Sequence, residues 1–467
     1  MKHKENILII GAGLCGSLLA LRLGQREYNV RVMELRPDLR KVDISAGRSI
    51  NLAFSNRGIK AMKMVGLEDK AMKLCIPMHG RMLHDRDGNT KLSKYSGRDG
   101  EYINSISREL LTALLMDEAE ALENVSIEFN NKCNDVDFEN NTANFTNTEN
   151  GQIFDCTADL IFGTDGAGSA LRKSYFSERK FLFSFSQNYL THGYKELTIP
   201  PSENGAFRTF KNALHIWPRG EYMIIALPNL DGSFTVTLFL AYEGGTYNFN
   251  NLTTKENVLN FFKNEFPDAL ELMPNLTSEF FENPTAPLGT VKCFPWQYKG
   301  KNLLLGDAAH AIVPFYGQGM NASFEDVVEF DTFLDQHDGN WENTFKAFQQ
   351  KRKIDTDGIA DLAIDNFHEM KDHVANALFQ KKRALEMTLE TELPNDYFSK
   401  YSMVTFREDM GYHEAMTRGR AQDKAILNMI NDQGIDQNVS ISSLHKKIKK
   451  ETNSILEDDK IAKTLNH

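Results

Sequence analysis

The first 34 residues contain a glycine pattern that limits the folds open to this chain. Asn6–Ile10 is typical of a short apolar strand, and it runs directly into Gly11-Ala-Gly13-Leu-Cys-Gly16. A helix and a second strand ending at Glu34 are expected to follow. Such glycines allow a tight turn, close approach of a pyrophosphate and helix–strand packing, and an acidic residue about 20 positions on can hold a ribose. The segment therefore predicts a dinucleotide-binding βαβ unit in which the three glycines and Glu34 contact the nucleotide.

A second apolar strand ends at an acidic turn. Leu303–Leu305 is followed by Gly306-Asp307, and then by a bend that contains Pro314 and two glycines. A helix is expected after the bend, with Asn321 or Ser323 as its N-cap because these residue types favour that position. Helix N-termini and glycine turns present main-chain N–H groups to anionic ligands. This stretch is therefore predicted to hold a polar cofactor and the negative charge that develops on it.

The rest of the chain predicts an α/β architecture with an inserted sheet. Asp159–Gly163 repeats the pattern of a buried strand, here before Asp165-Gly166, with Arg172 in the helix beyond. Between residues 181 and 287, alternating apolar runs predict an antiparallel sheet. Helical periodicity dominates from about residue 355 to residue 432.

These patterns define three predicted parts of the chain. Its 467 residues exceed the roughly 250–300 at which a single core stops growing, so several domains are expected. The dinucleotide-binding domain is assigned residues 1–75, 98–175 and 290–354. The substrate domain is assigned residues 76–97 and 176–289, and a C-terminal helical region residues 355–467. Residues 130–152, rich in Asn and Thr, are expected to form hairpin turns.

Composition excludes several classes of function. The formal charge of −11 argues against a nucleic-acid surface, which requires a basic stripe. The five cysteines contain no CxxC pair, so no zinc or other metal site is expected, and a reducing, cytoplasmic compartment fits. No run approaches the roughly 18 apolar residues of a membrane span, so no integral membrane anchor is predicted. A homodimer is left open.

Together the three motifs resemble the signatures of the single-component flavin-dependent aromatic hydroxylases. The resemblance implies an FAD-binding, Rossmann-like domain of the glutathione-reductase type and a fold similar to that of para-hydroxybenzoate hydroxylase. It also implies FAD as cofactor and NADPH as co-substrate. The cofactor-binding residues that it implies are Gly11, Gly13, Gly16, Glu34, Arg36, Arg108, Asp165, Asp307, Gly319, Met320 and Asn321.

Further segments resemble one branch of that group, the kynurenine 3-monooxygenase family. They are Gly47–Ala53, His192–Glu196, Ala213–Pro218, Ala226–Phe239, Val313–Asn321 and Tyr401–Phe406. The match runs from the N-terminus to about Tyr412. This resemblance implies hydroxylation of L-kynurenine at the ring carbon ortho to its amine, with O2 and NADPH as co-substrates, to give 3-hydroxykynurenine in tryptophan catabolism.

The same resemblance implies a substrate site. Arg81 corresponds to the arginine that binds the amino-acid carboxylate, and Tyr95 and Tyr412 to two tyrosines that share it. A guanidinium can donate two parallel hydrogen bonds to a carboxylate, and phenol hydroxyls can add more. Asn366 corresponds to an asparagine beside the substrate head group. The apolar walls and the flavin-side bend correspond to Leu214, Met223, Ile225, Leu227, Phe239, Pro314 and Phe315.

Some positions depart from the family pattern or have a simpler interpretation. Tyr316 stands where relatives show His or Phe, and Phe367 where Tyr is usual. Without the resemblance, Arg81 would be interpreted as a surface ion pair and the tyrosines as packing residues. His310 is interpreted as a structural histidine with one hydrogen bond, not as an acid–base group. The residues predicted to act at the reacting ring are Pro314, Phe315, Tyr316 and Gln318.

Two rival functions fit the same motifs. A related FAD monooxygenase or reductase could act on another aromatic or isoprenoid substrate, which a substrate screen would separate. A non-catalytic dinucleotide-fold escort protein could keep the nucleotide fold as a binding platform, and it would be colourless. Because there is no second glycine fingerprint for NADPH, that nucleotide is expected to bind transiently along the FAD groove, with an external reductase as the alternative.

Overall fold

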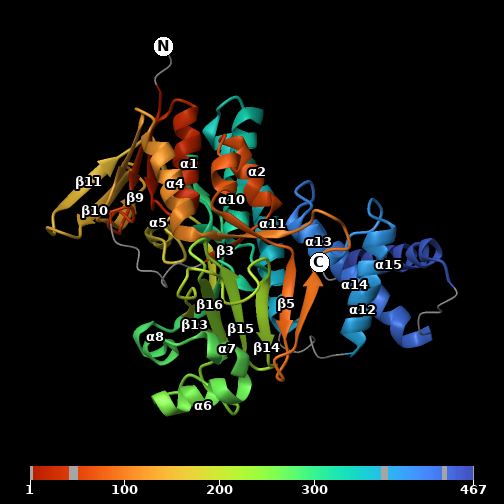
Figure 1. Ribbon diagram of the computed structural model, residues 1–467. Helices are drawn as coiled ribbons and strands as arrows, with labels where there is room; N and C mark the ends of the chain where they lie inside the picture. The colour runs from red at the N-terminus through yellow and green to blue at the C-terminus, as the bar shows by residue number, and fades with distance from the viewer. Residues whose placement is uncertain (1–3, 42–50, 370–376, 434–438, 466–467) are drawn as a thin grey trace.

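The computed structural model describes residues 4–41, 51–369, 377–433 and 439–465. Within the predicted segment Gly47–Ala53, residues 47–50 therefore lie outside the described residues. Figure 1 shows the N-terminal sheet and its helices at one end, a second large sheet at the other end, and the C-terminal helices along one side. The mixed α/β architecture agrees with the predicted fold class.

The first large sheet has six strands and is mainly parallel. Only its edge strand β18 runs antiparallel to a neighbour. Strands β12 and β19 are buried along their whole length, as expected for a parallel sheet covered on both faces. In spatial order the strands are β18 (Gln297–Tyr298), β19 (Asn302–Leu304), β12 (Leu160–Gly163), β1 (Asn6–Ile10), β2 (Asn29–Met33) and β8 (Val125–Glu128).

Three helices pack together beside this sheet (Figure 1). They are α1 (Leu14–Gln25), α4 (Arg108–Glu120) and α10 (Gly319–Gln336). Arg22 and Arg26 of α1 donate to Asp331 of α10, with Nε–Oδ1 distances of 2.8 and 2.5 Å. These ion pairs hold the glycine turn before α1 in a fixed position relative to the bend before α10. The shorter helices of this region are α2 (Asn56–Met64), α3 (Glu68–Met72), α5 (Ala170–Ser174), η1 (Tyr175–Ser177), α9 (Asp307–His310) and η2 (Pro314–Tyr316).

The second large sheet has seven strands, antiparallel as predicted except at one pair. Strands β14 and β5 run parallel, which is allowed because they come from distant segments and no hairpin joins them. Helices α6 (Lys255–Glu265), α7 (Pro267–Leu272) and α8 (Leu276–Glu282) contribute to the apolar core on one face. In spatial order the strands are β17 (Ala286–Phe294), β13 (Ser184–Ile199), β16 (Phe234–Ala241), β15 (Met223–Pro228), β14 (Leu214–Pro218), β5 (Gly80–His84) and β6 (Thr90–Lys94).

Two three-stranded sheets complete the β structure. One consists of β3 (Asn51–Phe54), β7 (Ile103–Ser107) and β4 (Cys75–Met78), and the other of β9 (Asn131–Asp137), β10 (Thr142–Asn147) and β11 (Ile153–Thr157). The expected hairpin turns occur at residues 138–141 and 148–150, where they join these three antiparallel strands. Val136, Ala143 and Phe145 form a buried face, and the Asn and Thr residues that suggested turns lie largely on the other face.

The C-terminal region is helical, as predicted. Its helices are α11 (Trp341–His368), α12 (Ala377–Glu392), α13 (Lys400–Thr405), α14 (Tyr412–Gln433) and α15 (Ile441–Leu465). Leu444 and Ile448 of α15 share an apolar core with Leu385 and Leu389 of α12. None of the helices in the described ranges is both long enough and apolar enough to span a bilayer.

Candidate active site

The glycine turn between β1 and α1 is packed on one side and open on the other. Gly11 has a φ of 98°, and a Cβ added there would lie 2.9 Å from Asp165 Cα. A Cβ on Gly16 would lie 1.9 Å from the Gly11 carbonyl oxygen, so packing requires both glycines. A Cβ on Gly13 would meet nothing within 4 Å, and Gly13 immediately precedes α1. The open space and the main-chain N–H groups of this helix start suit a pyrophosphate.

Glu34 follows β2 and orders the same turn. Its Oε2 accepts a hydrogen bond from Ala12 N–H at 2.7 Å, and its Oε1 accepts one from Arg36 N–H at 3.0 Å. Each carboxylate oxygen keeps a further lone pair that a ribose hydroxyl could use. The Arg36 side chain is 73% exposed and lies 3.4 Å from the Glu34 carboxylate.

Asp165 has one carboxylate oxygen without a partner. Its Oδ2 accepts from Ala170 N–H at 2.6 Å, whereas Oδ1 is buried with no hydrogen bond to any described residue. Burial raises the pKa of this carboxyl, and the bonds from Ser169 and Ala170 oppose that shift. A buried polar atom is costly unless something donates to it, so Oδ1 suits a bound hydroxyl or amide.

Asp307 and Arg108 are exposed residues whose charges interact. Asp307 follows Gly306, whose φ is 59°, and its side chain is exposed to solvent. Burial among protein atoms nevertheless raises the pKa of Asp307, while Arg108 and His310 lower it. Arg108 is the exposed first residue of α4, so its charge is available to the same ligand.

The bend before α10 differs from its predicted form. Gly317 is left-handed with a φ of 67°, and the helix starts at Gly319 with Gln318 as the N-cap residue. The prediction of Asn321 or Ser323 as cap is therefore wrong. Asn321 is fully buried inside the first turn, where Nδ2 donates to the Ala53 and Gly317 carbonyls and Oδ1 accepts from Ser55 N–H. The glycine turn lets the helix begin earlier than cap preferences alone predict. Met320, the preceding residue, is also buried.

Arg81 lies against a stack of three tyrosine rings. Tyr95 and Tyr401 have ring centroids 5.6 Å apart and planes 11° apart, and Tyr401 and Tyr316 have values of 5.7 Å and 16°. The Arg81 guanidinium carbon is 4.4 Å from the Tyr401 centroid and 5.3 Å from the Tyr95 centroid. Burial opposes the charge of Arg81, but Tyr401 and Tyr95 raise its pKa overall. The strongest electrostatic partners of this cation are thus phenols.

Tyr95 adds an unused hydrogen-bonding group to this cluster. Its ring is fully buried, and its hydroxyl has no hydrogen-bond partner among the described residues. A half-buried guanidinium that lies against phenol rings, next to an unsatisfied hydroxyl, suits an external carboxylate. Tyr401, on α13, has no assigned role in the sequence analysis, although it begins the matching segment Tyr401–Phe406. That tyrosine within a matching segment is the signal that could have identified it.

The predicted apolar walls lie beside the stack. Met223, Ile225 and Leu227 alternate along one face of β15, whereas Ile224 and Ala226 join the core on the opposite face. Two buried clusters meet at Ile225 and Tyr401, which pack against both. One cluster contains Met223, Phe239, Phe315 and Tyr316, and the other contains Leu214, Leu227 and Tyr95.

The reported similarities agree with this arrangement. A family model described as an FAD binding domain matches residues 4–186 and 253–337. The chain is 44% identical over 427 residues to kynurenine 3-monooxygenase of Myxococcus xanthus (strain DK1622), covering 91% of each chain. It is 44% identical over 473 residues to kynurenine 3-monooxygenase of Dictyostelium discoideum, covering 98% of each.

The chain belongs to the kynurenine 3-monooxygenase family.

Among solved structures, the tetrameric form of 2-methyl-3-hydroxypyridine-5-carboxylic acid oxygenase has the same fold. Its TM-score is 0.63 at 20% identity, with 84% of this chain and 98% of that chain covered. The structure of PqsL from P. aeruginosa in complex with 2-aminobenzoylacetate gives a TM-score of 0.62 at 17% identity, covering 79% of this chain and 97% of that one. The family's FAD-binding fold is therefore present in this chain.

Within this kynurenine 3-monooxygenase family member, Tyr412 lies in a different contact from the one predicted. Its hydroxyl donates to Gln318 Oε1 at 3.0 Å, and the Arg57 guanidinium carbon lies 4.0 Å from its ring centroid. Tyr412 and Gln318 are both buried. This pair joins the start of α14 to the start of α10, beside the bend. Asn366 also reaches the bend, where its Nδ2 donates to the Phe315 carbonyl at 2.5 Å.

A buried network of charges supports the bend from behind. Arg352 donates to Asp326 Oδ1 at 2.8 Å and to Glu325 Oε2 at 2.7 Å, and Arg57 pairs with the same Glu325. His310 Nε2 lies 2.5 Å from Asp326 Oδ2. Burial raises the pKa of Asp326, but His310 and Arg352 lower it below its ordinary value. The structural interpretation of His310 agrees with this contact.

Proposed function

We propose that this chain is an FAD-dependent monooxygenase that converts L-kynurenine to 3-hydroxykynurenine with NADPH and O2. Membership of the kynurenine 3-monooxygenase family supports the reaction. The observation that carries the substrate assignment is Arg81, a half-buried cation that lies against the rings of Tyr401 and Tyr95. An amino acid with an aromatic amine side chain supplies the carboxylate and the ring that such a site requires.

At the acid end of the site, we assign the carboxylate of kynurenine to Arg81, Tyr95 and Tyr401. Arg81 can donate two hydrogen bonds, and the Tyr95 hydroxyl is available to donate a third. The proximity of Tyr401 to Arg81 favours Tyr401 over Tyr412 for this role. Tyr412 is instead assigned to holding Gln318 at the helix start.

At the ring end of the site, the arylamine is assigned to the apolar slot beside the bend. Its walls are Leu214, Met223, Ile225, Leu227 and Phe239, with Pro314 and Phe315 on the flavin side. These side chains exclude water and orient the ring, which lets the ring amine direct hydroxylation to the ortho carbon. Asn366 donates a hydrogen bond to the Phe315 carbonyl and so fixes the position of the bend.

The cofactor assignment follows from the groove between the glycine turn and the bend. Gly13, Glu34 and Asp165 present open space, lone pairs and an unpaired oxygen where the adenosine diphosphate half would lie. Asp307 and Arg108 are assigned to the ribityl and phosphate part, and Gly319 and Met320 to the ring. When bound, FAD supplies the activation of oxygen. Asn321, whose amide is satisfied by protein, is assigned to shaping the bend.

The domain boundaries of the sequence analysis are retained as part of the proposal. The six-stranded sheet and its helices support the discontinuous FAD-binding assignment, and the joining of β5 and β6 to the seven-stranded sheet supports placing residues 76–97 with residues 176–289. The five free cysteines support a reducing, cytoplasmic compartment.

The test is a spectrum and a turnover assay on the purified protein. The protein should be yellow, kynurenine should accelerate its oxidation of NADPH, and mass spectrometry should detect 3-hydroxykynurenine. A colourless protein would favour the escort alternative and overturn the proposal. A flavoprotein whose NADPH oxidation responds to other aromatic acids but not to kynurenine would retain the cofactor and reject the substrate.

A further inference from the structure

The loop that carries Tyr95 is fastened directly to helix α12. Arg383 Nη2 donates to the Tyr95 carbonyl at 2.7 Å, and Thr391 Oγ1 donates to the Gly97 carbonyl at 3.2 Å. A Cβ on Gly97 would lie 2.5 Å from the Met387 carbonyl oxygen, so the loop backbone touches the helix backbone. The position of Tyr95 therefore depends on a helix that is distant in the sequence.

Glu390 of α12 is the point at which this loop and α13 meet. Its Oε2 accepts from Gly97 N–H at 3.0 Å. Its Oε1 accepts from Ser399 N–H at 2.9 Å and from Ser402 Oγ at 2.6 Å. Ser399 is the N-cap of α13 and Ser402 follows Tyr401, so one fully buried carboxylate holds the segments of both rings that flank Arg81.

Arg98 completes the cluster and supplies its countercharge. Its Nη1 lies 3.3 Å from Glu390 Oε1, its Nε donates to the Pro394 carbonyl at 2.8 Å, and its Nη2 donates to the Tyr397 carbonyl. The guanidinium carbon is 3.9 Å from the Phe398 ring centroid. Burial opposes ionisation of Glu390, but Ser402, Ser399 and Gly97 lower its pKa, so it is a carboxylate at neutral pH.

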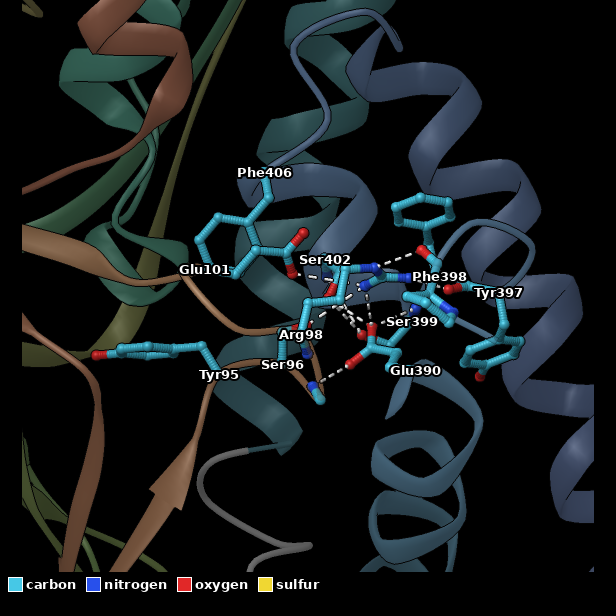
Figure 2. Close-up of polar contacts among 12 residues, drawn as sticks. Tyr95, Ser96, Arg98, Glu101, Glu390, Tyr397, Phe398, Ser399, Ser402 and Phe406 are labelled. Carbon is cyan, nitrogen blue, oxygen red and sulfur yellow. Dashed lines mark hydrogen bonds and ion pairs between the residues drawn. The ribbon is translucent and has the colours of Figure 1, made fainter. Parts of the chain in front are cut away.

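Figure 2 shows the contacts of this cluster and the position of Tyr95 relative to it. Glu390 and Arg98 contact main-chain groups and serines, while the Tyr95 ring extends away from them. The cluster therefore fixes the backbone on either side of Tyr95 without using its hydroxyl, which has no partner among the described residues.

We propose that Glu390 is a positioning residue for substrate recognition: it sets the spacing of Tyr95 and Tyr401 and thereby the geometry of the carboxylate site at Arg81. This inference rests on the proposed function. The alternative is that Glu390 only stabilises the helical region. The two roles differ because a positioning role affects ligands with a carboxylate more than ligands without one.

The test is Glu390→Gln in the FAD-loaded enzyme without NADPH, with ligand binding followed by the flavin absorbance. If the glutamine Oε1 accepts from Ser399 and Ser402, its NH2 group faces Gly97 N–H. Both of these groups are hydrogen-bond donors, so they repel each other and displace the loop. The Kd for kynurenine should rise by about tenfold, since small displacements of a bidentate site weaken binding strongly. The Kd for 2-aminoacetophenone, an arylamine ketone without the carboxylate, should stay within about twofold. FAD content should be unchanged.

Leu389→Ala is the matched control. Leu389 is adjacent in α12 and fully buried, but it packs with Leu385 and Leu444 on another side of the helix. It should lower Tm at least as much as Glu390→Gln while leaving the Kd for kynurenine unchanged. If Leu389→Ala raises that Kd as much as Glu390→Gln does, general loosening explains the effect and the positioning role is overturned.

A second variant covers the case in which Glu390→Gln does not fold. Gly97→Ala places a methyl group against Met387 and Thr391 and moves the same loop while keeping Glu390. It should also weaken kynurenine more than 2-aminoacetophenone, and equal Kd values for wild type and variant would overturn the inference. If the wild-type flavoprotein itself gives no response to kynurenine, the proposed function fails. If the wild type responds and the variants bind kynurenine unchanged, only the positioning role fails.

Discussion

The glycine turn and the Arg81 cluster are built in opposite ways. Most of the turn comes from the first 36 residues, in which Glu34 accepts hydrogen bonds from the Ala12 and Arg36 N–H groups. Thr164 and Asp165 add the packing against Gly11. The Arg81 cluster draws on β5, the loop after β6, the bend and α13, and it leaves the Tyr95 hydroxyl without a protein partner. In the proposed assignment, a local motif would provide the platform for a cofactor, whereas long-range packing would create the unsatisfied groups that select a substrate.

The largest effect should come from breaking the local motif. In Gly16→Ala the new methyl would overlap the Gly11 carbonyl, so we expect loss of bound FAD and of all turnover. Flavin absorbance per mole of protein measures this. Gly13→Ala is the control, because its methyl meets no protein atom within 4 Å. Gly13→Ala should leave the Tm of the FAD-free protein unchanged and should weaken FAD binding. A normal flavin content in Gly16→Ala would contradict the packing argument.

The next effect should come from the cation of the long-range cluster. Arg81→Ala removes a bidentate donor and should raise the KM for kynurenine by about a hundredfold or more, because a charge-assisted pair is lost. FAD content should not change, since Arg81 is not assigned to the cofactor. Steady-state kinetics with flavin quantification provide both values. An unchanged KM would remove Arg81 from the substrate site.

Acid should destabilise the substrate-side sheet through His215 on β14. His215 is fully buried, with Nε2 2.7 Å from the Phe210 carbonyl and Nδ1 2.8 Å from His84 Nε2, and burial lowers its pKa from 6.5 to about 4. Between these values the unfolded chain takes up a proton that the folded chain does not. The free energy of unfolding should therefore fall by about 2 kcal/mol from pH 7 to pH 5, and the contribution should be fully present above pH 6.5.

Urea unfolding at both pH values, in wild type and in His215→Gln, measures this contribution. The variant cannot gain the proton, so its dependence on pH should be weaker by that amount. Equal slopes for the two proteins would show that His215 does not titrate in this way.

The smallest effect should come from the unsatisfied hydroxyl. Tyr95→Phe removes a buried group that has no protein partner, so the protein without substrate should become more stable by up to about 1 kcal/mol. Kynurenine binding should weaken by about tenfold because that hydroxyl is assigned to the carboxylate. Thermal unfolding and flavin titration give the two values. Tyr401→Phe removes a hydroxyl that bonds Arg81 and should instead lower the stability of the protein. If both variants changed the free energy of unfolding in the same direction, the difference between the two hydroxyls would be contradicted.

The fold was predictable where neighbouring residues determine it. Strand β1 occupies the predicted residues Asn6–Ile10, and Glu34 follows β2 as the fingerprint requires. The N-cap prediction from residue preferences was wrong at Asn321. Gly317 turns the chain early, and the Asn321 side-chain amide donates to the Ala53 carbonyl instead. Composition indicated the hairpin turns at residues 130–152 but not the strands that they join, because polar residues occupy the outer face of that sheet.

The substrate site was less predictable because its geometry depends on distant segments. Arg81 and Tyr95 were identified only through the resemblance to a known family, and their mutual placement depends on the pairing of β5 with β14 and of the loop with α12. No periodicity reveals that α13 brings Tyr401 over Arg81. The roles of these residues stay predictions until the variants are measured.

The dependence of Tyr401 on α13 also affects the order in which the protein matures. During synthesis, every segment assigned to the cofactor has been made once α10 is complete. The acid end of the pocket must wait for another helix pair and for α13 itself. A nascent or clipped chain could therefore hold flavin before it is able to discriminate among substrates, and such a chain would consume reductant without making product.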